Sequence, residues 1–280
     1  MKGKSIILAA ALVTQTLAFG ANMVTKVDSS QNQATQNAEL IMGEASKVLY
    51  SLNAQDSNTI SIKYAFYKPK NSKAALEPYQ ITFNEIVHEN AMWETLSSFD
   101  EELVSTDITT QFFHDRLDTV AAIYSDEQAF NEHSIMWDLL THTEVLEFKH
   151  HISLTISNYS HTGGAHGSSN IQHFLIDRAS GELLELSDLF TDTDQVNTLA
   201  EVQYRELYDI TFEEELSDYD FWFPNDTFAV NENFTIQGNA IVFDFNEYEI
   251  APYYYGGTEL VIPLEDLEPF MTEYMKSTLD

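Results

Sequence analysis

The chain has 280 residues, of which 44% are hydrophobic and 12% are aromatic, so it has enough apolar side chains for a sizeable core. Its 13 Lys and Arg residues stand against 45 Asp and Glu residues, which gives a net charge of −32. This charge repels nucleic acids and anionic membranes, and it either attracts a cationic protein or serves solubility alone. The chain has no cysteine, which excludes disulfides, thiolate metal sites and a cysteine nucleophile.

The N-terminus has the pattern of a secretory signal. Two lysines, Lys2 and Lys4, precede a short apolar run that ends in small residues. We expect residues 1–20 to be cleaved off after Gly20, which leaves an exported protein. A periplasmic location is expected first, and the cell surface or secretion are the alternatives. The run is shorter than the roughly 20 residues of a spanning helix, and no span is expected after cleavage. Residues 21–46 are polar and are predicted to be a flexible leader.

A hairpin and two helices are expected next. Apolar residues alternate over 48–52 and 60–66, which indicates two strands with one buried face. Thr82 and Glu85 have the spacing of a capping box, so a helix is expected to start there. A second helical pattern covers 108–124.

One long strand is predicted over 146–156, because apolar residues occupy its even positions except His150. We expect His150 to be a hydrogen-bonded core histidine on that apolar face. A tight turn at Gly163 and Gly164 follows, where a positive φ suits glycine. These two glycines are expected to tolerate substitution least.

The remaining elements are a hairpin around Gly181, a helix capped near Asp192, a hairpin over 234–245, a further strand and a last helix. The fold class is therefore α+β, with a mainly antiparallel sheet, hairpins and a few covering helices. We expect two α/β subdomains, an N-terminal one over 47–150 and a C-terminal one over 151–280.

Three sequence landmarks stand in order in the second half. They are Thr-Gly-Gly-Ala-His-Gly at 162–167, the segment 177–190 that ends in Leu-Ser-Asp-Leu-Phe, and the segment 248–263 that begins Tyr-Glu-Ile-Ala-Pro-Tyr. Together they resemble the extracytoplasmic domain family found at the C-terminal end of the anti-sigma factor RsiV and in the peptidoglycan deacetylase PdaC. The resemblance covers about Ser153 to the end of the chain.

This resemblance implies a binding module of the cell envelope and not an enzyme. In RsiV the domain senses by binding lysozyme, and in PdaC the catalysis belongs to a separate metal-dependent domain that nothing here resembles. A cationic protein such as lysozyme, or a peptidoglycan-associated ligand, is therefore the expected partner. The acidity fits a cationic partner, because residues from His151 onward hold 25 acidic residues and three basic ones.

His161 and His166 flank the glycine turn and are candidate binding residues. Neutral imidazoles are good zinc ligands, and a turn can bring them together. However, this spacing across a glycine turn is not a metal motif, and no carboxylate lies within the turn. We expect the histidines to shape a surface, with no metal and no cofactor bound.

Asp188, Asp192 and Asp194 raise the question of calcium. They lack the glycine and the distal glutamate of an EF-hand loop. Helix capping explains Asp188 or Asp192 better.

Glu249 stands between aromatic residues, where a carboxylate is a candidate general acid. No second carboxylate or nucleophile is spaced to act with it, so we expect it to accept backbone hydrogen bonds in an irregular turn. Three neighbouring tyrosines are either interface anchors or core residues: Tyr253, Tyr254 and Tyr255.

The sequence thus favours an exported binding protein. A cell-wall glycan hydrolase or deacetylase, or an accessory of one, and a structural envelope protein without a specific ligand are the alternatives. No catalytic residue is assigned. The residues assigned to the fold of the motifs are Gly163, Gly164, Asp188, Glu249, Pro252 and Gly256.

Overall fold

The computed structural model describes residues 37–51, 55–90, 108–130 and 136–279. The predicted signal peptide at 1–20, and the predicted leader as far as residue 36, lie outside these residues. No helix in the described part of the chain is long and apolar enough to cross a membrane.

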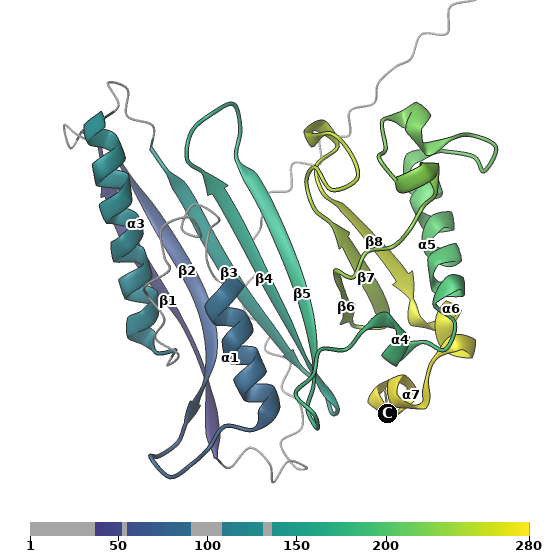
Figure 1. Ribbon diagram of the computed structural model, residues 1–280, viewed down its shortest axis with the longest axis horizontal. Helices are drawn as coiled ribbons and strands as arrows, with labels where there is room; N and C mark the ends of the chain where they lie inside the picture. The colour runs from purple at the N-terminus through teal and green to yellow at the C-terminus, as the bar shows by residue number, and fades with distance from the viewer. Residues whose placement is uncertain (1–36, 52–54, 91–107, 131–135, 280) are drawn as a thin grey trace, which may run out of the picture. The chain divides into compact units, whose positions relative to one another are not determined.

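The first sheet has five strands in the order β1-β2-β3-β4-β5 (Figure 1). All neighbours are antiparallel except β2 and β3, which pair in parallel over three residues. The bounds are β1 Ala38–Tyr50, β2 Ser57–Pro69, β3 Asp138–Glu147, β4 His151–His161 and β5 Ser168–Asp177.

Two helices, α1 (Pro78–Asn90) and α3 (Thr110–Phe130), cover one face of this sheet (Figure 1). Aromatic rings fill the space between them and the strands. Tyr64 of β2 stacks on Phe113 of α3, with ring centroids 4.1 Å apart. Tyr67 meets Phe83 of α1 edge to face, at 5.1 Å.

The second sheet has three antiparallel strands in the order β6-β7-β8. Its core centres on Tyr204 of α5, whose buried ring contacts five aromatic neighbours. The strands are β6 Phe234–Gln237, β7 Ala240–Phe245 and β8 Thr258–Pro263. The helices are α4 Leu186–Leu189, α5 Thr193–Tyr208, α6 Leu264–Leu267 and α7 Glu273–Leu279. Four short 3-10 turns complete it: η2 Leu216–Tyr219, η3 Pro224–Asp226, η4 Tyr253–Tyr255 and η5 Glu268–Phe270.

The α+β class predicted from the sequence is confirmed by these two mainly antiparallel sheets and their helices.

Two boundaries differ from the prediction, the start of the first strand and the division between the two subdomains. β1 begins at Ala38, so residues 38–46 are strand and not leader. Only Ala38, Ala45 and Leu49 of β1 are buried, and backbone pairing with β2 over the whole strand holds it in place. Because only these three side chains are buried, apolar and polar residues do not alternate clearly along the sequence of β1.

The first sheet also runs across the predicted subdomain boundary between residues 150 and 151. β4 pairs with β3, and β5 pairs with β4, so both belong to the N-terminal sheet. The apolar core under α1 and α3 accordingly includes Ile152, Leu154 and Ile176. The core of the second sheet begins with Leu175. The division into independently folding domains stays a prediction.

The single long strand predicted over 146–156 is wrong. The chain turns back between β3 and β4, and the N–H of Phe148 donates to the carbonyl of His151 (2.9 Å). The turn residues Lys149 and His150 carry none of the Gly, Asn or Pro signals of a tight hairpin. Consequently His150 lies half-buried in the turn, and its neighbour His151 is the fully buried histidine.

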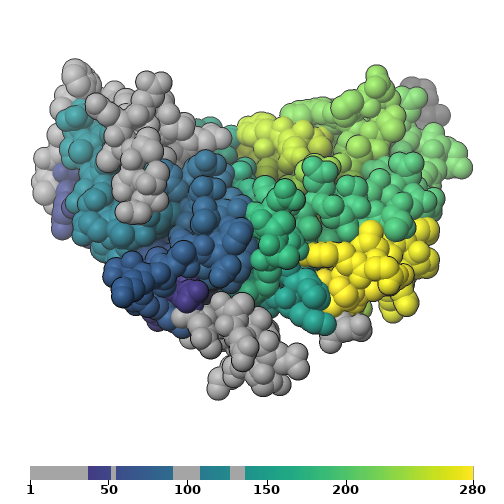
Figure 2. Space-filling model, turned by 60° about the horizontal axis from the view of Figure 1, so that its bottom comes forward, coloured from purple at the N-terminus to yellow at the C-terminus, as the bar shows by residue number. Residues whose placement is uncertain are grey.

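The capping box predicted at Thr82 is also wrong, because α1 begins at Pro78, where proline suits the first helical position. Thr82 lies inside the helix, and its hydroxyl donates to the carbonyl of Gly181 (2.7 Å). Gly181 has φ +77°, and a Cβ there would lie 2.7 Å from the backbone of Pro78. Figure 2 shows the blue surface of α1 against the green segment that follows β5.

Candidate binding surface at the glycine turn

The glycine turn joins β4 to β5. Gly163 has φ +126° and Gly164 has φ +93°, which confirms the positive φ predicted for the turn. No heavy atom lies within 4 Å of a Cβ built on Gly164, so only backbone conformation restricts that position. The next glycine, Gly167, is tighter, because a Cβ there would overlap the ring of Tyr159. Burial raises the pKa of Tyr159, and the carboxylates of Asp138 and Glu247 add to this rise.

His166 connects this turn to the tyrosine-rich loop, residues 248–255. Its ring stacks on Tyr253 with centroids 3.5 Å apart and planes 15° apart. Its Nδ1 lies 2.9 Å from the carbonyl oxygen of Gly167, which only accepts, so Nδ1 carries the proton. In this tautomer Nε2 accepts from the hydroxyl of Tyr248 at 3.3 Å. The two predicted motifs therefore form one surface, although they are over 80 residues apart in the sequence.

The three tyrosines of η4 have three different environments. Tyr253 is the partner of His166, and burial raises its pKa. Tyr254 is 68% exposed and donates to Asp220 (2.9 Å), a hydrogen bond that raises its pKa to about 12. Tyr255 packs on Phe221 (4.9 Å) and donates to the carbonyl of Tyr219 (3.0 Å). One predicted anchor is thus part of the core, and Tyr254 is the exposed one.

Glu249 holds the loop in shape. One carboxylate oxygen accepts from the backbone N–H of Asn246 (2.8 Å) and the other from the side-chain amide of Asn231 (2.7 Å). This is the backbone-accepting role that we expected. The loop then enters η4 through Pro252 and leaves it at Gly256, which has φ +73°.

His161 and Asp188 are not part of this surface. His161 is the last residue of β4, and the structure gives its side chain no hydrogen bond or ring contact with any described residue. Asp188 caps α4, because its carboxylate accepts from the N–H of Glu185 (2.8 Å). Asp192 caps α5 by accepting from Gln195 (3.1 Å). Among the described residues, no three His, Asp or Glu side chains are grouped to hold a metal ion.

Side chains close the outer edge of β5, which the sequence analysis did not predict. Three outward N–H groups of this strand donate to side-chain oxygens instead of to another strand. They are Ser169 to Glu247 (3.0 Å), Ile171 to Asn246 (2.7 Å) and His173 to Asn233 (2.8 Å). The carbonyl of Ile171 accepts from Asn233 and Asn246 in turn. The glycine turn and the tyrosine loop are therefore held together by residue-specific contacts.

A polar cluster lies next to this edge, in which the side chains of His173 and Asp244 are largely buried and Glu259 is exposed. His173 Nε2 is 2.6 Å from the Asp244 carboxylate, and its Nδ1 is 2.9 Å from the hydroxyl of Thr155. Glu259 is the cross-strand neighbour of Asp244. Although Glu259 is exposed, the protein around its carboxyl desolvates it and raises its pKa, and the nearby Asp244 raises it further. The one sequence signal was Asp244 within the apolar run Ile-Val-Phe-Asp-Phe.

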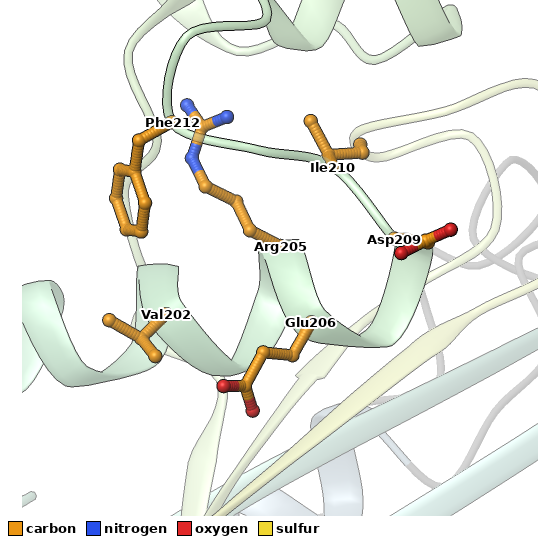
Figure 3. Close-up of a pocket in the computed structure, with 6 residues that line it drawn as sticks. All are labelled: Val202, Arg205, Glu206, Asp209, Ile210 and Phe212. Carbon is orange, nitrogen blue, oxygen red and sulfur yellow. The ribbon is translucent and has the colours of Figure 1, made fainter.

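The surface continues from Tyr254, through its hydrogen bond to Asp220, into the acidic segment that follows α5, residues 209–223. Arg205 is the only Lys or Arg between residues 179 and 275. Its guanidinium is bound by Glu201 (2.8 Å) and by two backbone carbonyls, and it lies 5.0 Å from the Phe212 ring centroid (Figure 3). An open pocket of about 240 Å³ lies there. Phe212 and Trp222 are exposed in this carboxylate-rich segment.

Known structures share this fold over most of the chain. Two crystal structures are similar to the chain, a DUF3298 family member from Bacteroides fragilis NCTC 9343 and a DUF3298 family protein from Pseudomonas aeruginosa PAO1. The alignment with the Bacteroides fragilis structure has 20% sequence identity and a TM-score of 0.58. It covers 84% of this chain and 94% of the Bacteroides fragilis chain. The alignment with the Pseudomonas aeruginosa structure has 17% sequence identity and a TM-score of 0.53. It covers 85% of this chain and 95% of the Pseudomonas aeruginosa chain. At these identities the likeness shows the fold alone.

No curated protein matches the chain. Residues 187–265 match the family model described as protein of unknown function (DUF3298), a shorter span than the resemblance predicted from Ser153 onward. This span contains the acidic segment and the tyrosine loop, and it excludes the glycine turn. Residues 187–265 are therefore the part of this chain that is similar in sequence to the DUF3298 family.

Proposed function

We propose that this chain is an exported protein of the bacterial envelope that binds a cationic protein, with a lysozyme-like protein as the first candidate. A peptidoglycan-associated ligand is the alternative partner. The export part of the proposal rests on the signal pattern of residues 1–20. The binding part rests on the resemblance of the three motifs and on the surface around His166.

One observation carries the proposal. Tyr248 and Tyr254 are 52% and 68% exposed, on a loop joined to a segment that is rich in carboxylates. Exposed tyrosines supply contact area together with a polar tip, which is typical of binding anchors. The only basic side chain of residues 179–275 is Arg205, and it is already bound by Glu201. A cationic partner would therefore meet aromatic rings and negative charge.

Binding is a better proposal than catalysis for the same residues. Both oxygens of Glu249 accept hydrogen bonds that shape the loop, so neither is poised toward a substrate. His166 is stacked on Tyr253, and its two ring nitrogens face Gly167 and Tyr248. A hydrolase or deacetylase would need an acid and a base within hydrogen-bond reach of one substrate atom.

The test is a calorimetric titration of the purified protein with a cationic lysozyme at low and at moderate salt. We expect binding at micromolar protein that weakens as salt rises, because screening acts on exposed charges. Tyr254→Ala and Tyr248→Ala should each weaken binding. Tyr50→Ala is the matched control, since Tyr50 is 60% exposed but lies on β1.

Three results would decide against the proposal. No binding at micromolar protein excludes the lysozyme-like partner. Equal loss in Tyr50→Ala and Tyr254→Ala shows that the loop is not the binding site. Binding that is unaffected by salt shows that charge does not drive it. If cell-wall fragments fail to bind as well, and Tyr254→Ala and His161→Ala change nothing but stability, the structural envelope role is favoured.

A further inference from the structure

The two edges of the five-stranded sheet differ. The edge of β5 is closed by Asn233, Asn246 and Glu247, as described above. The opposite edge is β1, a strand of 13 residues without proline, and no described residue pairs with its outer side. Long edge strands left open in this way are templates for pairing with another strand.

The hydrogen bonds at both ends of the β1–β2 pair show which backbone groups are free. Asn37 accepts from Lys70 N, and Ser51 N donates to Asp56. Both residues are odd-numbered, and their pairs continue the register of the strands without a bulge. Successive residues direct their backbone groups to opposite sides. The even residues therefore direct N–H and C=O to the open edge: Leu40, Met42, Glu44, Ser46 and Val48.

The side chains of β1 also suit burial against a second strand. On the face away from α1 and α3, Met42, Val48 and Tyr50 are all exposed. On the helical face, Lys47 pairs with Asp118 of α3 at 2.7 Å, and Glu39 lies on the same face. Apolar side chains on an open edge are usually replaced by charges or proline in proteins that avoid pairing.

We propose that the open edge of β1 pairs with β1 of a second copy of this chain, antiparallel about a twofold axis through Gly43. In this register Glu39 stands directly opposite Lys47 of the second copy, and the symmetry makes this contact twice. An axis through Glu44 sets that carboxylate against its own copy, and an axis through Met42 leaves Glu39 opposite Ala45. The two sheets then form one sheet of ten strands.

The high negative charge of the chain does not oppose this contact. Residues 38–73, which contain β1 and β2, hold five lysines and three acidic residues. The negative charge is concentrated in the C-terminal half, where residues from His151 onward hold 25 acidic residues against three basic ones. Two copies thus meet through a part of the chain in which lysines outnumber acidic residues.

Sedimentation equilibrium of the purified full chain tests the proposal. A concentration-dependent dimer is expected, and a monomer at about 100 μM overturns it, since the edge contact would then be too weak to count as specific. Glu39→Lys and Lys47→Glu place like charges at both contacts. Each variant alone should weaken the dimer by about tenfold or more.

Measuring the dimer formed when the two variants are mixed is the decisive test of the register. Glu39→Lys in one copy and Lys47→Glu in the other give two Lys–Glu contacts, so a heterodimer of near wild-type affinity is expected. Misfolding of either variant cannot produce this recovery. Asp118→Asn removes the partner of Lys47 within the chain and should leave dimerisation unchanged. No recovery on mixing overturns the register.

Ser46→Pro tests the edge itself. Proline removes an N–H that points away from β2, so the β1–β2 ladder keeps its hydrogen bonds while pairing with a second copy is blocked. Hydrogen exchange should show protected amides at the even residues of β1 in the dimer only. A dimer that Ser46→Pro leaves intact, or a monomer with those amides protected, overturns the proposal.

Discussion

The Nε2 atom of His173 lies 2.6 Å from the carboxylate of Asp244, with only 6% and 14% of the two side chains exposed. This contact joins β5 of the first sheet to β7 of the second. The hydroxyl of Thr155 lies at the other ring nitrogen of His173, so both nitrogens have partners. The pair is therefore a satisfied polar contact between the two cores, and it lies next to the candidate surface.

Replacing Asp244 should destabilise the protein in a graded way. Asp244→Ala leaves a buried nitrogen of His173 without an acceptor, and a loss of about 1–3 kcal/mol in the free energy of unfolding is expected. Asp244→Asn should cost less, because its amide oxygen still accepts. Urea denaturation at neutral pH measures both. Equal costs for the two variants would contradict the assigned hydrogen bond.

Gly181 and Gly238 give a matched pair of glycine substitutions. Both have positive φ, at +77° and +59°, but a Cβ on Gly181 would meet the backbone of Pro78, whereas Gly238 has open space. Gly238→Ala should cost about 1 kcal/mol from backbone strain alone. Gly181→Ala should cost at least about 1 kcal/mol more, because α1 must shift.

The measurement is again the free energy of unfolding, compared between the two variants. Similar costs would show that α1 adjusts freely beside Gly181. Gly164 also has a positive φ and room for a Cβ, so only backbone strain is expected there, and the low tolerance expected of Gly163 and Gly164 stays a prediction. Space, and not only φ, decides which glycine is least replaceable.

Local patterns predicted several parts of this structure from the sequence. The α+β class, the positive φ at Gly163 and Gly164, the cap at Asp192 and the backbone-accepting role of Glu249 are all present. Each depends on residues close together in the chain. The hairpin at Lys149 and His150 was missed because neither residue carries a turn signal, and the apolar residues on both sides of His150 keep the same even-numbered period.

Contacts between distant segments were beyond local patterns. The stack of His166 on Tyr253 requires the glycine turn and the tyrosine loop to meet, and no periodicity encodes that meeting. The same holds for Asn246, whose amide serves a strand 75 residues away. Asparagine in a loop predicts a turn, but not an edge strand as its partner.

His151 should make the stability of this protein sensitive to acid. The ring is fully buried, it stacks on Phe148 at 4.5 Å, and neither nitrogen has a hydrogen-bond partner among the described residues. Burial, followed by the charge of Arg178, lowers its pKa to about 4. In the unfolded chain the pKa is about 6.5.

Between these two pKa values the unfolded chain binds a proton that the folded protein does not. The stability should therefore fall as the pH falls from about 6.5 to about 4, by up to about 3 kcal/mol from this residue. His151→Leu should match the wild type at pH 7.5 and exceed it near pH 4.5. Exposed His114→Gln is the control and should keep the wild-type profile. A wild-type profile in His151→Leu would contradict the prediction.

Asn246 should be the most sensitive residue of the closed edge of β5. Its side chain accepts from the N–H of Ile171 (2.7 Å) and donates to the carbonyl of the same residue (3.0 Å). Asn246→Ala removes both bonds, and we expect a loss of about 1–3 kcal/mol in the free energy of unfolding. Asn246→Asp keeps the acceptor and loses the donor, so its cost should be smaller. Because Asn233 also donates to this carbonyl, the N–H of Ile171 is the group that loses its only side-chain partner. Hydrogen exchange should therefore accelerate at Ile171 in Asn246→Ala more than in Asn246→Asp, and equal acceleration in both would show that the acceptor is not what protects this edge.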